Sequence, residues 1–351
     1  MTVTVRSFAK INLGLCVGAP RPHGFHDLRT VYQTIALHDI IGVQVGRGIG
    51  IEIRCDDERV PKDQTNTCYR IAECAMHALG ASGRVTITID KRLPVQGGLG
   101  AGSGNAVATL LALERALKKE LPGAERLRIA AEVGSDLPLF LVGGTVLGTG
   151  RGEEVYPLPD LPSACCVVAT PEIGVSTPKA FADWDAMIGT LKEPAELRSA
   201  RTAGGGRPHV DRADARSKLT RLPPSDRMIE FGRAVSAWLS GQPLSGVPVS
   251  RGRGRAETSL LDLVRTGIEN DFERVVFPKY PELREVKSVL ERAGAFYASL
   301  SGSGSAVYGL FRSRAAGQKA AARLQHNGVP AVATTSLTRR QYWKKFPVSG
   351  F

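Results

Sequence analysis

Residues 94–105 have the composition that most directly suggests a chemical role. They read Pro-Val-Gln-Gly-Gly-Leu-Gly-Ala-Gly-Ser-Gly-Asn, so five of the twelve are glycine. Because glycine has no Cβ, several backbone N–H groups of such a loop can turn toward one ligand. A helix that starts at the end of the loop adds unpaired N–H donors and the positive end of its dipole. The stretch therefore predicts a binding site for a phosphate or another anion.

The flanking residues supply the elements that such a loop needs. Arg84–Asp90 alternates apolar and polar residues as a half-buried strand does, and Ala106–Leu117 has leucines at helical spacing. Ser103 and Asn105 could cap this helix or contact a phosphate oxygen. No Gly-Lys-Ser/Thr follows, which excludes a Walker A loop, and the glycine spacing does not match the Rossmann dinucleotide fingerprint. The alternative is a connecting turn without a ligand, although the loop is longer than a hairpin needs.

Two charged residues in apolar surroundings are further candidates for chemistry. Lys10 is the first lysine of the chain and lies in the apolar strand-like run Phe8–Leu13. A lysine is rarely buried without a partner, and an edge position with the amine in solvent is the ordinary alternative. Asn12 follows at strand period, so both side chains can reach one pocket. Asp136 lies between a helix end and a second apolar segment, where capping is its ordinary role.

Composition limits the class of protein. The chain has 351 residues, of which 42% are hydrophobic, enough for one large domain or two ordinary ones. It has no run of 18 apolar residues, and its first residues lack the pattern of a signal peptide. None of the six cysteines forms a Cys-x-x-Cys pair. This usage predicts reduced, buried thiols in a cytoplasmic protein without a membrane partner.

The net charge of +12 is unevenly distributed. Residues 1–160 carry 18 Lys or Arg against 17 Asp or Glu, whereas residues 161–351 carry 28 against 17. The excess lies mainly in 192–258 and in 311–351, which has no acidic residue. A basic surface can bind nucleic acid. No basic stripe with interleaved aromatic residues accompanies it, so we interpret it as solvated charge that suits an anionic substrate and expect no nucleic-acid partner.

The pattern in the first half predicts strands and helices around the glycine loop. Apolar and polar residues predict strands near 28–37 and 40–55, which we interpret as an antiparallel pair. Asn66 opens a helix that runs to about Leu79, and a second helix covers Glu125–Val133. A glycine-broken strand follows over 143–150.

The second half predicts a smaller sheet, with a domain boundary just before the apolar strand 161–170. Further strands at 296–300, 306–311 and 329–335, with helices at 281–293 and 315–325, suggest a small antiparallel sheet backed by two helices. We therefore predict domains at 1–160 and 161–337, a long polar insert at about 185–258 with one helix near 225–239, and a basic tail at 338–351.

The order of the motifs resembles a known family. Phe8–Leu13, Pro94–Asn105 and the second glycine loop at Gly302-Ser303-Gly304 resemble the three motifs of the GHMP small-molecule kinases. Three further stretches resemble the members that act on 4-(cytidine 5'-diphospho)-2-C-methyl-D-erythritol, namely His23–Leu28, Gly134–Phe140 and Gly174–Phe181. Such motifs in the right order make coincidence improbable, although each one alone is weak.

The resemblance implies an α+β fold of two domains. The first would be similar to domain 2 of ribosomal protein S5, with ATP in its glycine loop, and the second would be ferredoxin-like. It implies ATP-dependent phosphorylation of the 2-hydroxyl of the cytidine substrate, giving the 2-phosphate and ADP, in the non-mevalonate route to isoprenoid precursors. The family uses Mg²⁺ with ATP, and because magnesium on phosphates keeps waters and few protein ligands, we expect no metal-ligand cluster. The resemblance leaves open a monomer or a homodimer.

The resemblance also assigns roles to individual positions. Lys10 and Asp136 match the catalytic pair, with Asp136 accepting the hydroxyl proton and Lys10 keeping it ionised and offsetting charge on the γ-phosphoryl group. The positions that match ATP contacts are Asn66, Pro94, Gly97, Gly98, Leu99, Gly100, Ala101, Gly102, Ser103 and Gly104. Those that match substrate contacts are Asn12, Phe25, His26, Thr177, Phe181, Gly302 and Ser303, with Phe25 and Phe181 sandwiching the cytosine. Four positions depart from the family pattern: Phe25 stands for a common Tyr, Gly104 for a second Ser, and Gln96 and Ala101 replace small or glycine residues.

Two other functions remain open at this point. The chain could be a GHMP kinase for homoserine, mevalonate or a sugar, but these acceptors offer no base for Phe25 and Phe181 to stack on. It could also be a non-catalytic protein that binds an anion or RNA on an S5-like fold. The basic segments favour this reading slightly, whereas Lys10 together with Asp136 disfavours it.

Overall fold

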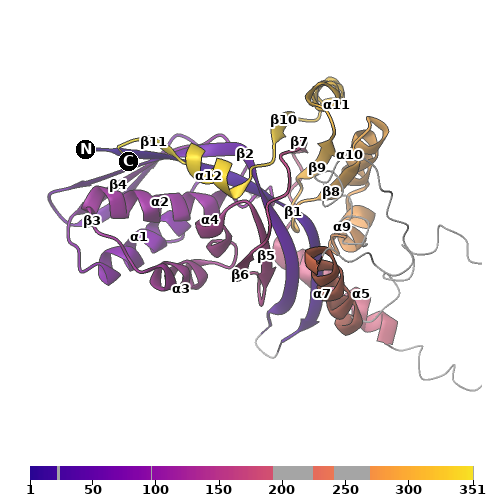
Figure 1. The fold of residues 1–351 in the computed structure, drawn as a ribbon, viewed down its shortest axis with the longest axis horizontal. Helices are drawn as coiled ribbons and strands as arrows, with labels where there is room; N and C mark the ends of the chain where they lie inside the picture. Colours follow the sequence, from indigo (N-terminus) through magenta and orange to yellow (C-terminus); the bar gives the residue numbers. More distant parts are fainter. Residues whose placement is uncertain (22–23, 96, 193–223, 241–268, 351) are drawn as a thin grey trace, which may run out of the picture.

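The computed structural model describes residues 1–21, 24–95, 97–192, 224–240 and 269–350. Within these ranges the chain forms a seven-stranded mixed sheet and a four-stranded antiparallel sheet, each with its own helices (Figure 1). The parts of the predicted insert at 193–223 and 241–268 lie outside the described residues. The fold is α+β, as predicted.

Two long strands run through the first sheet. β1 (Val3–Pro20) and β2 (His26–Gly46) pair antiparallel over most of their length and continue toward the second sheet (Figure 1). Their register shifts between Phe8 and Ala9 and again between Asn12 and Gly14. Such irregularities bend a strand and redirect its side chains. They enclose the segment that carries Lys10.

The predicted antiparallel pair at 28–37 and 40–55 is wrong. β2 is one continuous strand, and β3 (Gly50–Cys55) pairs with β4 (Arg84–Asp90) in parallel rather than with β2. β4 returns after α1 (Thr67–Ala78) and inserts between β2 and β3. The alternation of apolar residues correctly predicted strands here. It carries no information about which later strand pairs beside them.

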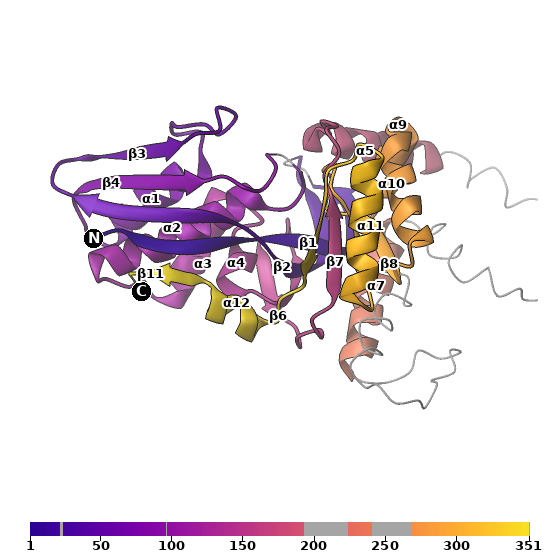
Figure 2. The same cartoon turned by 90° about the horizontal axis from the view of Figure 1, so that it is seen from above.

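Helices α1, α2 (Ala101–Leu117) and α3 (Gly123–Val133) bury their apolar faces in the core beside the first sheet, and α4 (Pro138–Val142) is added to them (Figure 2). β5 (Thr145–Thr149) then pairs with β2 and with β6 (Glu154–Pro157). The start of α1 follows the prediction, because the Asn66 side chain accepts a hydrogen bond from the Cys68 N–H and caps the helix.

The second sheet has the order β10-β7-β9-β8 and is antiparallel throughout, as predicted. Its strands are β7 (Cys165–Ala169), β8 (Tyr297–Leu300), β9 (Val307–Phe311) and β10 (Ala331–Thr335). The helices α10 (Pro281–Arg292) and α11 (Arg314–His326) share its apolar core, together with α5 (Thr177–Lys192) and α9 (Glu273–Lys279). Helix α7 (Pro224–Ser240) confirms the predicted helix within the insert and packs on β1.

The C-terminal segment is not the basic tail that its charge suggested. Residues 338–350 return to the first sheet, where α12 (Arg339–Lys345) precedes β11 (Pro347–Ser349) and β11 pairs with β1. The two ends of the chain therefore lie side by side (Figure 1). Thr338 and Gln341 form a capping box at the start of α12, and Tyr342 and Phe346 are buried.

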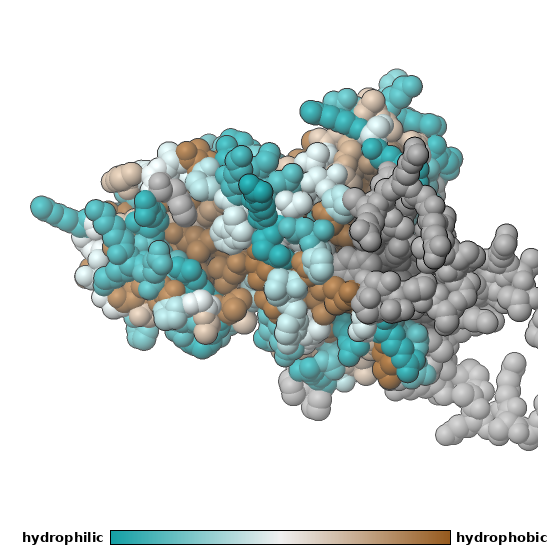
Figure 3. Space-filling model, in the orientation of Figure 1, coloured by the Kyte–Doolittle hydropathy of each residue, from teal (hydrophilic) through white to brown (hydrophobic). Residues whose placement is uncertain are grey.

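The surface of one face mixes hydrophilic residues with apolar ones that show between the helices beside the first sheet (Figure 3). None of the helices within the described ranges is long and apolar enough to cross a membrane. All six cysteines are free and five of them are buried. Burial raises the pKa of the Cys68 thiol to about 12, so this thiol stays protonated near neutral pH.

Candidate active site

The glycine loop lies directly against β1. Its Leu99 carbonyl accepts a hydrogen bond of 2.9 Å from the Lys10 N–H. Gly100 follows at φ +69 and forms the N-cap of α2, where a Cβ would lie 3.0 Å from Lys10 Cγ and from Phe140 Cζ. A larger residue would therefore push the loop away from the lysine, so the glycine is required for close approach.

The first glycine loop also interlocks with the second one at 301–305. The Gly97 carbonyl accepts from the Ala306 N–H at 3.0 Å, and the Gly98 carbonyl accepts from Ser301 Oγ at 3.0 Å. A Cβ on Gly98 would lie 2.2 Å from the Ser301 carbonyl oxygen, and one on Gly304 would lie 2.5 Å from the Gly98 nitrogen. Glycine at both positions thus lets two backbones from different sheets meet.

The start of α2 supplies free donors. In a helix the first N–H groups have no partner of their own, which leaves those of Ala101, Gly102 and Ser103 available to an anion. The helix begins five residues earlier than predicted because Gly100 adopts the left-handed conformation that starts it. Ser103 and Asn105 do not cap it, since α2 has no side-chain cap and Asn105 Nδ2 donates to Asp39 Oδ2 at 2.9 Å.

Gly104 lies away from the cavity that the loop encloses. Its N–H already donates to the Gly100 carbonyl at 2.8 Å within the first turn of α2. A Cβ at this position would lie 2.9 Å from the Phe8 carbonyl oxygen and from Ser7 Oγ. The predicted contact between Gly104 and phosphates therefore has no support in the geometry, because this residue packs α2 on β1.

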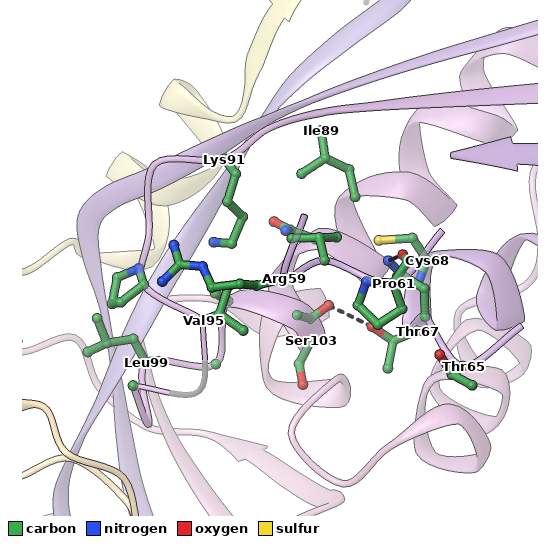
Figure 4. Close-up of a pocket in the computed structure, with 18 of the residues that line it drawn as sticks. Arg59, Pro61, Thr65, Thr67, Cys68, Ile89, Lys91, Val95, Leu99 and Ser103 are labelled. Carbon is green, nitrogen blue, oxygen red and sulfur yellow. Dashed lines mark hydrogen bonds between the residues drawn. The ribbon is translucent and has the colours of Figure 1, made fainter. Parts of the chain in front are cut away.

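A cavity of about 450 Å³ opens beside the loop (Figure 4). Its wall includes the predicted positions Asn66, Pro94, Gly97, Gly98, Leu99, Gly100, Ala101, Gly102 and Ser103. Arg59 and Lys91 bring their cationic groups to one side of it (Figure 4). A volume of this size is typical of small-molecule sites. The Asn66 side chain is engaged, because its Nδ2 also donates to the Pro61 carbonyl at 2.6 Å.

Lys10 and Asp136 meet beside this loop. Lys10 Nζ lies 3.4 Å from Asp136 Oδ2, and the Lys10 side chain is 4% exposed whereas that of Asp136 is 34% exposed. Lys10 Nζ also donates to Asn12 Oδ1 at 2.7 Å, as the strand period predicts. A Cβ on Gly302 would lie 3.5 Å from both Lys10 Nζ and Asn12 Oδ1. The amine is buried and paired, while its carboxylate partner remains open to a ligand.

Further hydrogen bonds fix this pair. Asn12 Nδ2 donates to Thr30 Oγ1 at 2.8 Å, which orients the amide so that its oxygen faces the lysine. Tyr32 Oη donates to Asp136 Oδ1 at 3.0 Å. Asp136 does not cap α4, which has no side-chain cap. Burial raises the pKa of the Tyr32 phenol well above its ordinary value, and the Asp136 carboxylate raises it further.

Most of the residues predicted to bind substrate gather on the side of the second sheet. Thr177 Oγ1 and Ser303 Oγ lie 2.8 Å apart. His26 and Phe181 stack with ring centroids 4.8 Å apart, and His26 Nε2 lies 2.7 Å from Asp185 Oδ1. Phe25 is 50% exposed, and its ring lies 5.1 Å from the Arg151 guanidinium carbon.

Comparison with known proteins identifies the family. Residues 66–144 match the model for the GHMP kinases N terminal domain and residues 256–330 match that for the GHMP kinases C terminal domain. A 4-diphosphocytidyl-2-C-methyl-D-erythritol kinase of Solibacter usitatus is 35% identical over 97% of this chain and 92% of its own. The chain belongs to the 4-diphosphocytidyl-2-C-methyl-D-erythritol kinase family.

Solved structures agree with this membership. A crystal structure of a 4-(cytidine 5'-diphospho)-2C-methyl-D-erythritol kinase has a TM-score of 0.65 and 26% identity, covering 95% of this chain and 98% of its own. The homoserine kinase of Cytophaga hutchinsonii has a TM-score of 0.66 at 18% identity, covering 96% and 95% of the two chains. At that identity the second likeness shows the shared fold alone. The two-domain GHMP kinase fold predicted from the motifs is confirmed.

The structure adds residues that the family motifs did not indicate. Asn270 Nδ2 donates to the Leu300 and Gly302 carbonyls at 2.9 and 2.7 Å and so holds the second glycine loop. Tyr32 contacts the candidate base, and Asp185 contacts His26. In the sequence a tyrosine within an apolar strand looks like an ordinary core residue. Only its position opposite Asn12 in the paired strand β1 gives a signal, and this pairing is not local.

Proposed function

We propose that this protein transfers the γ-phosphoryl group of ATP to the 2-hydroxyl of 4-(cytidine 5'-diphospho)-2-C-methyl-D-erythritol. The products are ADP and the 2-phosphate, a step in the non-mevalonate route to isoprenoid precursors. Membership of the family supports this substrate, because the related kinases carry it in their names. The observation that carries the chemistry is the Lys10–Asp136 pair, 3.4 Å apart, beside a glycine loop at a helix start.

The proposed reaction is a direct transfer. The substrate hydroxyl oxygen forms a bond to the γ-phosphorus while the bond from that phosphorus to the β–γ bridging oxygen breaks and ADP leaves. The hydroxyl proton passes to the Asp136 carboxylate, which is open to a ligand. Lys10 pairs with this carboxylate and offsets negative charge on the transferred group. Such transfers depend mainly on positioning and charge stabilisation, which two interlocked loops can provide.

ATP is expected in the cavity beside the first glycine loop. The free N–H groups at the start of α2 would face its phosphates, since a helix N-terminus favours negative charge. Arg59 and Lys91 also line the wall, where Arg59 is paired with Asp57 and Lys91 with Asp39. The adenine would lie against the start of α1. Asn66 forms part of the cavity wall there, and its side chain caps the helix.

We further propose that Mg²⁺ enters with the nucleotide. Among the described residues there is no group of three or more His, Cys, Asp or Glu that could hold a metal ion. This fits an ion that keeps its waters and is bound mostly by phosphates. Ser103 in the cavity wall and Asp136 beside Lys10 would be candidate oxygen ligands for it. When bound, the ion supplies positive charge to the phosphates, and the roles of Lys10 and Asp136 stay as described.

The cytidine end is proposed to bind between the two sheets. Phe181 is the expected stacking partner of the cytosine, with His26 on one side of its ring. Phe25 would supply the second ring from its half-exposed position. Thr177 and Ser303 are expected to contact the remainder of the substrate near the second glycine loop. We also keep as predictions that the protein is cytoplasmic and that it is a monomer or homodimer.

A coupled assay of ADP release tests the function. The purified protein is given ATP and Mg²⁺ with the cytidine substrate, homoserine, mevalonate or galactose in parallel. We expect turnover with the cytidine substrate to exceed that with every other acceptor. Preferred turnover of one of the other three would reassign the acceptor while retaining the GHMP kinase chemistry, and ADP release that no acceptor stimulates would contradict the proposal.

A further inference from the structure

Tyr32 holds a place in the site that no motif accounts for. It lies in β2, opposite Asn12 of β1 and Val146 of β5, and is 2% exposed. Its Oη donates to Asp136 Oδ1 at 3.0 Å, while Lys10 Nζ lies 3.4 Å from Oδ2. Each oxygen of the carboxylate therefore has its own cationic or donating partner. Held at two points, the carboxylate cannot rotate freely about its last bond.

Two glycines make room for the tyrosine ring. A Cβ on Gly148 would lie 2.5 Å from Tyr32 Cε2, and one on Gly152 would lie 2.6 Å from Tyr32 Oη. Gly152 also has a φ of +105, which favours glycine, and its Cβ would be 3.9 Å from Asp136 Oδ1. A Cβ at either position would force the ring or the backbone to move. Gly148 packs against the ring of Tyr32 and Gly152 against its hydroxyl, and this packing holds the hydroxyl within hydrogen-bonding distance of Asp136.

The protonation state of the phenol sets the direction of this hydrogen bond. Burial raises the pKa of Tyr32 well above its ordinary value, followed in size by the effect of the Asp136 carboxylate and then by Glu153. The phenol is therefore neutral throughout the pH range in which an enzyme of this class works. A neutral phenol donates to a carboxylate, so Tyr32 Oη is the donor and Asp136 Oδ1 the acceptor.

We propose that Tyr32 is a positioning residue for the catalytic base. Its hydrogen bond fixes the carboxylate of Asp136 so that a free lone pair of an oxygen faces the acceptor hydroxyl. This inference rests on the proposed function, in which Asp136 accepts the hydroxyl proton. Tyr32 itself neither binds the acceptor nor exchanges a proton in the reaction.

The test is Tyr32→Phe, which removes the hydroxyl and keeps the ring in place. We expect kcat to fall about 10- to 100-fold, the range for losing one hydrogen bond to a charged group. The KM values for ATP and for the acceptor should change little.

Tyr342→Phe is the matched control. Tyr342 is as buried as Tyr32. Its Oη donates to the Phe140 carbonyl at 2.8 Å and not to the Asp136 carboxylate. Each substitution removes one buried hydrogen bond, so both variants should lose some stability, but Tyr342→Phe should keep the kcat of the unsubstituted protein. An unchanged kcat in Tyr32→Phe, or the same loss in both variants, would overturn the inference. The comparison uses whichever acceptor the unsubstituted protein turns over, so failure with the cytidine substrate rejects the proposed function separately.

Discussion

Asp39 gives the sharpest test of how the glycine loop is held. This residue of β2 is 0% exposed, and its two oxygens accept four hydrogen bonds. Oδ1 accepts from the N–H groups of Arg92 and Leu93, each at 2.7 Å, and Oδ2 accepts from Lys91 Nζ at 2.8 Å and Asn105 Nδ2 at 2.9 Å. One carboxylate therefore joins the end of β4, the approach to the glycine loop and the first turns of α2.

Asp39→Ala should be strongly destabilising. The Lys91 side chain is 7% exposed, so the substitution leaves a nearly buried cation and two backbone N–H groups without their acceptor. Removing one partner of a buried ion pair costs about 3–5 kcal/mol. This is a large part of the total unfolding free energy of an ordinary domain, about 5–15 kcal/mol. Since the loop starts here, KM for ATP should also rise.

Urea unfolding followed by circular dichroism measures the loss. Glu285→Ala is the control, because Glu285 pairs with Arg292 on the surface, where ion pairs contribute little. Asp39→Ala combined with Lys91→Met should be more stable than Asp39→Ala alone, since the second change removes the unpaired cation. If Asp39→Ala unfolds at the same urea concentration as Glu285→Ala, the carboxylate does not hold the loop as argued.

The other predictions concern the site and its packing. Asp136→Asn should abolish turnover while leaving ATP binding by calorimetry nearly unchanged, and unaltered turnover would remove this residue from its role as base. Phe181→Ala should weaken binding of the cytidine substrate by about 1–3 kcal/mol, the range for base stacking, and equal affinity would argue against the stacking site. Gly104→Ser should lower the melting temperature, because its Cβ would be 2.9 Å from Ser7 Oγ, whereas Gly102→Ser should not, because its nearest contact is at 3.7 Å. A melting temperature that falls equally in both serine variants would show that packing on β1 is not the reason for glycine at 104.

Local patterns predicted the elements whose signals lie within a few residues. Asn66 caps α1 as its position before an apolar periodic run suggested, and β4 and α10 have nearly the predicted bounds. The start of α2 was misplaced because residues 102–105, Gly-Ser-Gly-Asn, have weak helical preference. There the helix follows from the left-handed Gly100 and from packing of Gly104 on β1.

Pairing between distant segments could not be predicted in this way. β4 lies between β2 and β3 but follows α1 in the chain. No local feature of the sequence therefore contradicted the predicted antiparallel pair at 28–37 and 40–55. At the C-terminus, the basic residues suggested a solvated tail, although Tyr342 and Phe346 are buried against the first core. The capping box of Thr338 and Gln341 was the available local signal for a helix there.

The candidate site shows the same division. Lys10 and Asn12 were expected to share a face from strand period alone, and their side chains are hydrogen-bonded. The meeting of Lys10 with Asp136 came from the resemblance to the family and not from spacing, since no local rule relates the two positions. Tyr32 and Asn270 were missed because the partners that give them meaning, Asp136 and the carbonyls at 300 and 302, lie far along the chain.

The interlocked glycine loops imply that the nucleotide and acceptor sides cannot move independently. Gly98 of the first loop and Ser301 and Gly304 of the second approach so closely that no Cβ fits between them. Lys10 lies at this junction, because Leu99 accepts from its N–H and Gly302 lies beside its amine. A shift of the second loop would therefore displace the first loop and the lysine together. In the proposed reaction the γ-phosphoryl group and the acceptor hydroxyl must meet within about an ångström of their reactive geometry. A backbone junction beside the amine of Lys10, closed by the hydrogen bond from Ser301 Oγ to the Gly98 carbonyl, supplies that constraint.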